Sequence, residues 1–261
     1  MPNVTVQEIT KFIESHIPGF HAKRLESLAE LKLEAVLRRK NPYLFKAKFV
    51  TSAPELVKLI LDAHLSSQEE TIFGGFLEEL AIFVCQRVYS GIKSSAEGID
   101  LEFEKDGIRY IVSIKSGPNW GNSSQISKMQ QNFAKAKRIL NTNTSAKNIV
   151  AVNGCCYGQE RIEDKGDYVK KCGQSFWAFI SGDDQFYTTI VEPLGHKAKE
   201  RNEEFQIEYG KVITRFTAEF TQAFCMADGG IDWHRIVEMN SGIPKPKAKK
   251  SKASESAAPI P

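Results

Sequence analysis

The segment from Gly98 to Gly117 alternates polar and apolar residues on both sides of an Asp106-Gly107 pair, and it constrains the fold more than any other part of the sequence. Alternation with a period of two is typical of β-strands, and Asp-Gly favours the tight turn that joins two antiparallel strands. If the turn has two residues, Lys105 pairs with Ile108, and the numbers of all paired residues then sum to 213. The sequence therefore predicts a β-hairpin.

This register gives the hairpin two different faces. Asp100 falls opposite Ser113 and shares a face with Ser113 and Lys115. The residues turned the other way are apolar, namely Ile99, Leu101, Phe103, Tyr110, Val112 and Ile114. Glu104 stands opposite Arg109, an opposite-charge pair that supports the same register. We expect the polar face, with Asp100 and Lys115, to be turned to solvent.

A carboxylate beside a lysine on neighbouring strands suits metal-assisted hydrolysis of a phosphodiester bond. Asp100 would hold a Mg²⁺ ion, which polarises the scissile phosphate and lowers the pKa of a bound water. Lys115 would orient that water or stabilise the developing charge. Asp and Lys on a hairpin also occur in many sheets without catalytic function, so the wider sequence must decide.

Asp100, the turn and the strand ending Ser113-Ile114-Lys115 resemble the core of the PD-(D/E)xK nuclease superfamily. The wider chain, over roughly residues 65–235, resembles type II restriction endonucleases of the group related to the PmeII enzyme, which includes enzymes reading interrupted GG/CC palindromes. Four stretches carry this second resemblance: SSQEETIFGGFLEELAIFV, SIKSGPNWGNSSQI, NGCCYG and FWAFISGDDQFYTTIVEPLGHKA. It implies an α/β, restriction-endonuclease-like core, a mixed sheet flanked by helices, with a helical N-terminal extension.

The sequence departs from the superfamily pattern at two positions. Ile99 precedes Asp100 where a proline is usual, and Ser113 stands where an acidic residue usually sits. A serine cannot supply the missing negative charge. In this superfamily the helix before the hairpin often points a glutamate at the metal, which makes Glu78 or Glu79 the implied second carboxylate.

Both glutamates lie in the segment FGGFLEELAIFV, just beyond opposite margins of its apolar arc, so helical periodicity does not choose between them. We favour Glu78, because its helical neighbours Ala81 and Cys85 are small and leave room for another element to approach. Glu102, on the strand of Asp100, is the next candidate. The backbone carbonyl of Ile114 is an additional candidate metal ligand.

The loop after Lys115 and the helix that follows it, at about 122–140, are candidates for DNA contacts. A helix N-terminus binds phosphates through its free N–H groups. The candidate residues are Asn119, Asn122, Ser124, Gln125 and Lys128. The alternative is that Asn122 or Ser123 simply caps the helix. Further along the chain, four residues are candidates for DNA contacts by their position alone: Asn153, Tyr157, Arg161 and Lys165.

The chain is expected to divide into three regions. Residues 1–66 form a helical N-terminal region with a break at Pro18-Gly19, and one helix begins near residue 54. Residues 67–242 form the nuclease core with a helical C-terminal part; it contains a second helix at about 73–89 and a long one at 196–224. Residues 174–182 are apolar and fit either a helix or a strand. Residues 243–261 form a disordered basic tail.

Composition excludes several classes of protein. No apolar run approaches the roughly 20 residues that span a bilayer, so we expect no membrane association and a place in the bacterial cytoplasm. The five cysteines lack CxxC spacing, which predicts reduced thiols and no structural zinc. The net charge of +3 does not by itself identify a nucleic-acid binder.

The sequence thus predicts a type II restriction endonuclease that cuts double-stranded DNA at a specific, palindromic site with Mg²⁺. Cutting both strands of a palindrome calls for two symmetric sites, hence a homodimer. A cognate DNA methyltransferase is expected in the same restriction-modification system, though not as a physical partner. The alternatives are a structure-specific repair or mobile-element nuclease, and a catalytically inactive DNA-binding module on the same fold.

Overall fold

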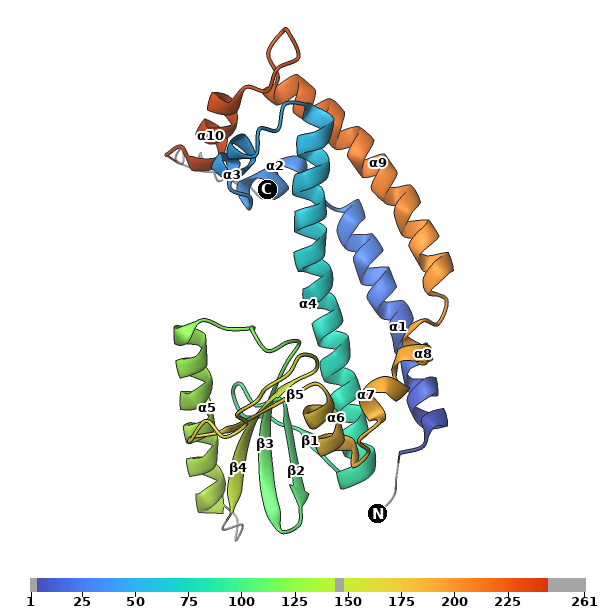
Figure 1. The fold of residues 1–261 in the computed structure, drawn as a ribbon, viewed down its shortest axis with the longest axis vertical. Helices are drawn as coiled ribbons and strands as arrows, with labels where there is room; N and C mark the ends of the chain where they lie inside the picture. The colour runs from blue at the N-terminus through green and yellow to red at the C-terminus, as the bar shows by residue number, and fades with distance from the viewer. Residues whose placement is uncertain (1–3, 144–147, 244–261) are drawn as a thin grey trace, which may run out of the picture. The chain divides into compact units, whose positions relative to one another are not determined.

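The computed structural model describes residues 4–143 and 148–243 of the chain (Figure 1). The helices in these ranges are α1 (Val6–Ala29), α2 (Leu33–Arg38), α3 (Pro42–Ala47), α4 (Ala53–Tyr89), α5 (Ser123–Asn143), α6 (Gln174–Ser181), α7 (Phe186–Thr189), α8 (Val191–Leu194), α9 (Ala198–Phe224) and α10 (Trp233–Ser241). The strands are β1 (Ile92–Lys93), β2 (Leu101–Lys105), β3 (Ile108–Lys115), β4 (Ile149–Cys155) and β5 (Val169–Cys172).

The described residues form two compact units. One contains residues 4–31 and 61–215, and the other contains residues 32–60 and 216–243. In the second unit α10 packs against α2 and α3, and Asn240 Nδ2 donates to the carbonyls of Leu37 and Lys40 at 2.9 and 3.2 Å. The division expected after residue 66 falls inside α4, and all but the first residue of the expected tail lies outside the described residues.

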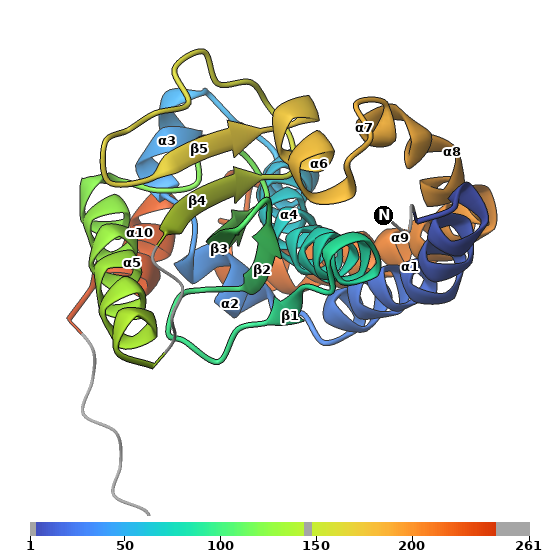
Figure 2. The same ribbon diagram turned by 90° about the horizontal axis from the view of Figure 1, so that it is seen from below.

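The first unit is built on a mixed sheet with helices on both faces, as expected from the sequence. The strand order is β1-β2-β3-β4-β5, in which β1, β2 and β3 are antiparallel and β3, β4 and β5 are parallel. Figure 2 shows α5 on one face of this sheet and α4 with α6 on the other. Parallel strands joined through a helix must be covered on both faces, which explains why β4 is almost wholly buried.

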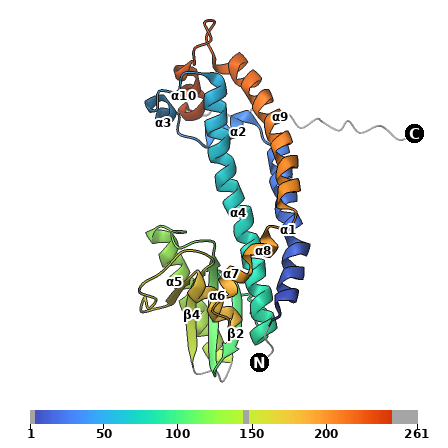
Figure 3. The ribbon, with the colours of Figure 1, turned by 45° about the vertical axis from the view of Figure 1, so that its right-hand side comes forward.

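The larger apolar core lies between the sheet, α1, α4 and α6. Ile13 of α1, Leu80 of α4 and Ile180 of α6 are completely buried there, together with Val112 of β3. Phe12 of α1 also stacks on Phe83 of α4, with ring centroids 4.2 Å apart, and Figure 3 shows α1 running beside α4. A smaller core joins Ile111 and Ala151 of the sheet to Met129, Phe133 and Ala136 of α5.

The predicted hairpin and its register are confirmed. Leu101 pairs with Val112 and Lys105 with Ile108, and all intervening pairs follow the same register. Asp106 and Gly107 have φ angles of 54° and 75°, as a type I′ turn requires. Both conformations are left-handed, which glycine adopts freely and aspartate tolerates better than most residues.

The alternation of faces breaks at Asp100, where the expectation for Ile99 is wrong. Ile99 packs in the smaller core with Ile111, on the face opposite Leu101. The backbone N–H of Asp100 donates to the carbonyl of Val112 at 2.8 Å, although Val112 is already the partner of Leu101. Asp100 and Leu101 thus both face Val112, as in a β-bulge. The bulge shifts the alternation by one residue and changes the direction of the Asp100 side chain.

The polar face of the hairpin is not turned to solvent as expected. Over Ile111 it is covered by α5, and Ser113 and Glu102 are 1% and 8% exposed. Its two ends keep access to solvent: Glu104 is exposed near the turn, and at the other end the side chains of Asp100 and Lys115 are 22% and 29% exposed. The reason is that the parallel pairing of β3 with β4 requires a covering helix, which a free hairpin would not need.

Two predicted helix breaks are absent. Helix α1 continues through Pro18, because Ile9, Ile13 and Ile17 anchor it in the core on both turns before the proline. Helix α4 is continuous from Ala53 to Tyr89, where two helices were expected. Its polar middle stays helical, with the hydroxyl of Thr71 donating to the carbonyl four residues earlier at 3.0 Å.

The ambiguous segment at 174–182 begins with helix α6, whose residues Phe176, Trp177 and Ile180 lie at helical spacing in the core. All five cysteines are free thiols. Among the described residues, no helix combines the length and the apolar composition that would let it cross a membrane.

Candidate active site

The candidate site lies at a fork between β2 and β3. Pairing between these strands ends at Leu101 and Val112, whereas β3 continues through Ser113, Ile114 and Lys115 with β4 as its partner. The N–H of Ile114 is therefore outside the β2 ladder, and it donates to Oδ2 of Asp100 at 2.6 Å. This bond fixes the Asp100 carboxylate in the opening of the fork.

The carbonyl of Ile114 faces the same opening. The N–H and C=O of one strand residue point to the same side, and the N–H of Ile114 points to Asp100. On the other side, the ladder with β4 uses the carbonyl of Lys115, which accepts from the N–H of Cys156 at 2.9 Å. A backbone oxygen and a carboxylate thus lie on the same side of β3.

Lys115, the last residue of β3, directs its side chain back to Asp100. Its Nζ lies 3.8 Å from Asp100 Oδ2 and 5.3 Å from the centre of the Trp120 ring. With 29% of its side chain exposed, the ammonium group is partly shielded from water, so its interaction with the carboxylate is stronger than that of a fully exposed pair.

Glu78 of α4 joins this group, whereas Glu79 is exposed. Burial raises the pKa of Glu78, and the negative charge of Asp100 raises it further, while the nearby ammonium groups of Lys93 and Lys115 oppose the shift. The structure therefore brings Glu78, Asp100 and Lys115 together.

Small residues let α4 approach the fork. Ala81 and Cys85 are completely buried, and a side chain at Gly91 would collide with the sulfur of Cys85. One turn before Glu78, a Cβ atom on Gly74 would lie 3.4 Å from the Cβ of Ser116, the residue after Lys115.

The other acidic candidate, Glu102, is bound elsewhere. Arg109 donates to its Oε2 at 2.7 Å, and the hydroxyl of Ser94 donates to its Oε1. Arg109 thus forms its ion pair with Glu102 and not with Glu104, its partner in the register, because residues 102 and 109 are diagonal neighbours on one face. Ser113 lies near Asp100, with 3.5 Å between its Oγ and Asp100 Oδ2.

Sequence reasoning missed Lys93. Its Nζ lies 3.7 Å from Oε1 of Glu78, which gives each carboxylate of the fork a lysine neighbour. Strand β1 has only two residues, too short to produce any alternation, so no pattern in the sequence indicated that Lys93 would lie here.

The loop after Lys115 is anchored to the sheet. Trp120 Nε1 donates to Oδ1 of Asn153 at 3.1 Å, and Asn153 Nδ2 donates to the carbonyl of Ser113 at 3.3 Å. Asn153 is 1% exposed, so the expectation that it contacts DNA is wrong; it holds the loop in place. Asn119, within the loop, is exposed.

The start of α5 is a capping box around Asn122. Its Oδ1 accepts from the N–H of Gln125 at 3.1 Å and from the hydroxyl of Ser124 at 2.7 Å, while Gln125 Oε1 accepts from the N–H of Asn122 at 2.9 Å. Lys128 pairs with Glu97 at 3.1 Å. The capping alternative is thus realised, and DNA contacts by these residues stay a prediction.

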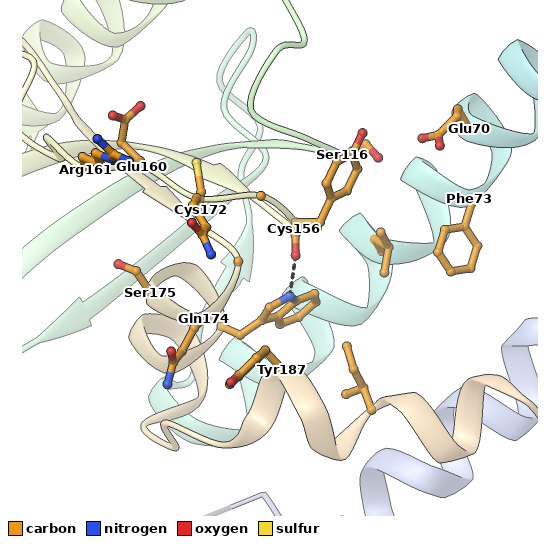
Figure 4. Close-up of a pocket in the computed structure, with 17 residues that line it drawn as sticks. Glu70, Phe73, Ser116, Cys156, Glu160, Arg161, Cys172, Gln174, Ser175 and Tyr187 are labelled. Atoms are coloured by element: carbon orange, nitrogen blue, oxygen red, sulfur yellow. Dashed lines mark hydrogen bonds between the residues drawn. The ribbon is translucent and has the colours of Figure 1, made fainter.

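A cavity of about 730 Å³ lies next to the fork (Figure 4). Leu77 and Ser116, the neighbours of Glu78 and Lys115 in the chain, contribute to its wall, and Trp177 lies in it with its Nε1 donating to the Cys156 carbonyl at 2.8 Å. Glu160, on the opposite side, has a pKa lowered to about 2, first by the N–H of Ile162 and then by two lysines.

The fork and its surroundings lie within the part of the chain that matches a known family. Residues 7–202 match the family model of type II restriction endonuclease EcoO109I. The chain belongs to this family. The match covers α1, α4, the whole sheet and α6, so the mixed sheet with its flanking helices is a restriction-endonuclease-like α/β fold.

Membership of the EcoO109I family makes double-stranded DNA the substrate and its cleavage the activity. A search of curated proteins gives no match. The finer resemblance, to enzymes of the PmeII-like group and to those reading interrupted palindromes, stays a prediction.

Proposed function

We propose that this restriction endonuclease hydrolyses phosphodiester bonds of double-stranded DNA at a specific, palindromic site with Mg²⁺, using Glu78, Asp100 and Lys115 as in the PD-(D/E)xK superfamily. The observation that carries the proposal is the fork. In the fork the N–H of Ile114 holds Asp100 Oδ2, and Lys115 lies 3.8 Å from the same oxygen. Glu78, on α4, lies close enough for the charges of Asp100 and Lys115 to act on its pKa.

The oxygen groups at the fork fit Mg²⁺, which prefers one or two carboxylates completed by other oxygens. Within residues 4–143 and 148–243, no group of three or more His, Cys, Asp or Glu side chains could hold a metal ion. The carboxylates of Asp100 and Glu78 would therefore need the Ile114 carbonyl, water or DNA phosphate as further ligands. Burial raises the pKa of Glu78, and repulsion by Asp100 raises it further; a bound cation would relieve that repulsion.

When bound, Mg²⁺ supplies electrostatic stabilisation of the phosphate and a water that loses its proton more readily. The chain's own residues then orient the reactants. Asp100 is fixed by its bond from Ile114, and Lys115 donates hydrogen bonds to the attacking water or to the phosphate oxygens as negative charge develops. Trp120 limits the directions in which the Lys115 ammonium can turn.

Glu78 replaces the acidic residue that is usual at the position of Ser113. Ser113 is buried and its hydroxyl brings no charge, whereas Glu78, on α4, supplies a carboxylate close enough to Asp100 for the two charges to repel. Glu79 is exposed and Glu102 is bound by Arg109, which leaves Glu78 as the better candidate. With Glu78 on a helix, the site would still offer the metal two carboxylates, although the strand carries a serine.

The remaining parts of the proposal concern assembly and setting. Two symmetric active sites are needed to cut both strands of a palindrome, which favours a homodimer. An enzyme that cuts DNA within a bacterial cytoplasm also calls for a methyltransferase that protects the host genome.

A digest of a long defined DNA tests the proposal. The protein is incubated with the DNA and Mg²⁺, and the fragment ends are mapped by sequencing; discrete fragments with symmetric ends are expected. Excess chelator should stop cutting, and Ca²⁺ should support binding without cutting, because its looser coordination fills the site without the required geometry. A smear of fragments would indicate a structure-specific or unspecific nuclease, and binding without cutting an inactive DNA-binding module.

A further inference from the structure

Lys93 is the one charged group contacting Glu78 or Asp100 in the described structure to which the proposed function gives no role. It is the last residue of β1 and pairs with Leu101, the residue after Asp100. The next residue, Ser94, donates its N–H to the Asp100 carbonyl at 3.3 Å. The edge strand therefore holds Lys93 directly beside the backbone of Asp100.

The two lysines of the fork differ in exposure. Lys115 lies 3.8 Å from Asp100 with 29% of its side chain exposed, whereas Lys93 lies 3.7 Å from Glu78 with 69% exposed. An ion pair with so much exposure is weak. The Lys93 side chain therefore meets little resistance when it leaves Glu78, whereas Lys115 is confined by Asp100 and the Trp120 ring.

The charges of the fork explain what such a movement would accomplish. Glu78 and Asp100 carry two negative charges, and Lys93 and Lys115 carry two positive ones. A divalent cation bound by the two carboxylates leaves the lysines with uncompensated positive charge. An exposed ammonium group in that state attracts the phosphates of an approaching duplex.

We propose that Lys93 forms an ion pair with the Glu78 carboxylate in the metal-free protein. Once a divalent cation binds Glu78, the Lys93 side chain leaves it and contacts a phosphate of the DNA backbone. The inference rests on the proposed function, because it takes Glu78 as a metal ligand. It gives the Lys93 side chain two roles: it competes with the metal for Glu78, and it contacts a DNA phosphate.

Two opposite effects follow from this double role. Removing the Lys93 charge should strengthen metal binding, because the cation no longer displaces a lysine from Glu78. The same change should weaken DNA binding, because one phosphate contact is lost. A purely structural role would weaken both or change neither.

The first measurement is calorimetric titration of the full-length protein with Mn²⁺ in the absence of DNA. Lys93→Met keeps the apolar stem and removes the charge, and we expect it to bind Mn²⁺ about 2- to 5-fold more tightly than the wild type. Lys211→Met is the matched control: Lys211 and its partner Glu208 are 66% and 34% exposed, compared with 69% and 32% for Lys93 and Glu78. The control should bind Mn²⁺ as the wild type does.

The second measurement is binding of a duplex carrying the mapped cleavage site in Ca²⁺ over a range of salt concentrations. Each lost phosphate contact lowers the slope of log K against log salt by about 0.9. We expect this change, with several-fold weaker binding at low salt, for Lys93→Met and not for Lys211→Met. Lys93→Arg should restore the slope. Thermal melting of each variant verifies that it is folded.

The outcomes separate the inference from the proposed function. Unchanged or weaker Mn²⁺ binding by folded Lys93→Met would overturn the inference, and so would an unchanged salt slope, even if the wild type cuts DNA as proposed. A wild-type protein that binds no metal and cuts no DNA would overturn both. Tighter metal binding together with a smaller salt slope supports the inference.

Discussion

Glu78 and Glu160 lie in the same compact unit, Glu160 in the wall of the cavity and Glu78 next in the chain to Leu77 of that wall, yet their surroundings shift their pKa values in opposite directions. Glu160 accepts a hydrogen bond from the N–H of Ile162 and pairs with two lysines at 3.2 and 3.3 Å, which lowers its pKa to about 2. Glu78 is partly buried beside Asp100, which raises its pKa.

The negative charge of Glu160 is balanced by groups of the chain, whereas that of Glu78 would be stabilised by a bound cation. The charge of Glu160 is balanced by the chain itself, as in a structural ion-pair cluster. The charge of Glu78 is opposed by its surroundings and only partly balanced by an exposed lysine, an arrangement that favours a functional site.

The largest effect is expected at the centre of the fork. Asp100→Asn and Lys115→Met should each lower the cleavage rate by at least about 10³-fold, because one removes a metal-binding charge and the other the donor to the water or phosphate. Rates are measured on the mapped DNA site, with Glu160→Gln as the control that should cut normally. A loss of activity in Glu160→Gln equal to that in Asp100→Asn would remove the distinction between the two regions.

The next effect distinguishes the two helix glutamates. Glu78→Gln keeps the shape and removes the charge, so it should raise the Mg²⁺ concentration for half-maximal cutting and lower the maximal rate by about 10- to 100-fold. Glu79→Gln should change either value by less than about 2-fold, since Glu79 is exposed. A dead Glu79→Gln with an active Glu78→Gln would reverse the choice. Two active variants would make Glu102 the next candidate.

A smaller effect is expected from restoring an acid on the strand. Ser113→Glu in the Glu78→Gln background should recover a few-fold in rate, because residue 113 lies close to the Asp100 carboxylate. Rescue should be partial, since position 113 is 1% exposed and has little room for a longer side chain. Recovery that is equally strong with Ser113→Gln would contradict a role for the charge.

The smallest effect concerns stability against pH. A lowered pKa means that Glu160 stabilises the folded state above its ordinary value of 4.5, a contribution lost as pH falls to about 2. A raised pKa means the reverse for Glu78, whose charged form destabilises the fold at neutral pH. In thermal melts at neutral pH, Glu160→Gln should lower Tm and Glu78→Gln should raise it, each by about 1–3 °C.

Both differences in Tm should diminish in acid. That of Glu78→Gln should vanish below about pH 4, where the wild-type carboxyl is protonated in the folded and unfolded states. That of Glu160→Gln should narrow only at lower pH. Shifts of the same sign at neutral pH would mean that the two carboxylates are not in opposite environments.

The hairpin was predictable because its register depends on local rules. The Asp106-Gly107 pair fixes the turn, and counting outward from it gives each partner down to Leu101 and Val112. The superfamily resemblance pointed to Glu78 or Glu79, and the small residues beside Glu78 on the helix favoured it; its role as a metal ligand stays a prediction. The counting failed at Asp100, because a bulge depends on how β2 leaves β3 and leaves no mark in the alternation.

Other features depended on tertiary contacts that the sequence does not display. Lys93 reaches Glu78 through a two-residue strand, and Arg109 chooses Glu102 diagonally over Glu104 directly opposite. Pro18 normally ends a helix, yet the core on one side of α1 outweighs the lost hydrogen bond. The sequence placed Asn153 at the end of a strand, but it did not indicate the hydrogen bond that Asn153 accepts from Trp120.

Because Gly74 has no side chain, α4 can approach Ser116 closely beside the candidate active site. Gly74 and Gly75 are adjacent in α4, yet a Cβ at position 75 would meet nothing within 4 Å, while one at position 74 would touch Ser116 at 3.4 Å. Alanine at either position favours the helix. A branched side chain at 74 alone would act as a wedge, moving the turn that carries Glu78 away from Asp100, so the two glycines should tolerate mutation very differently.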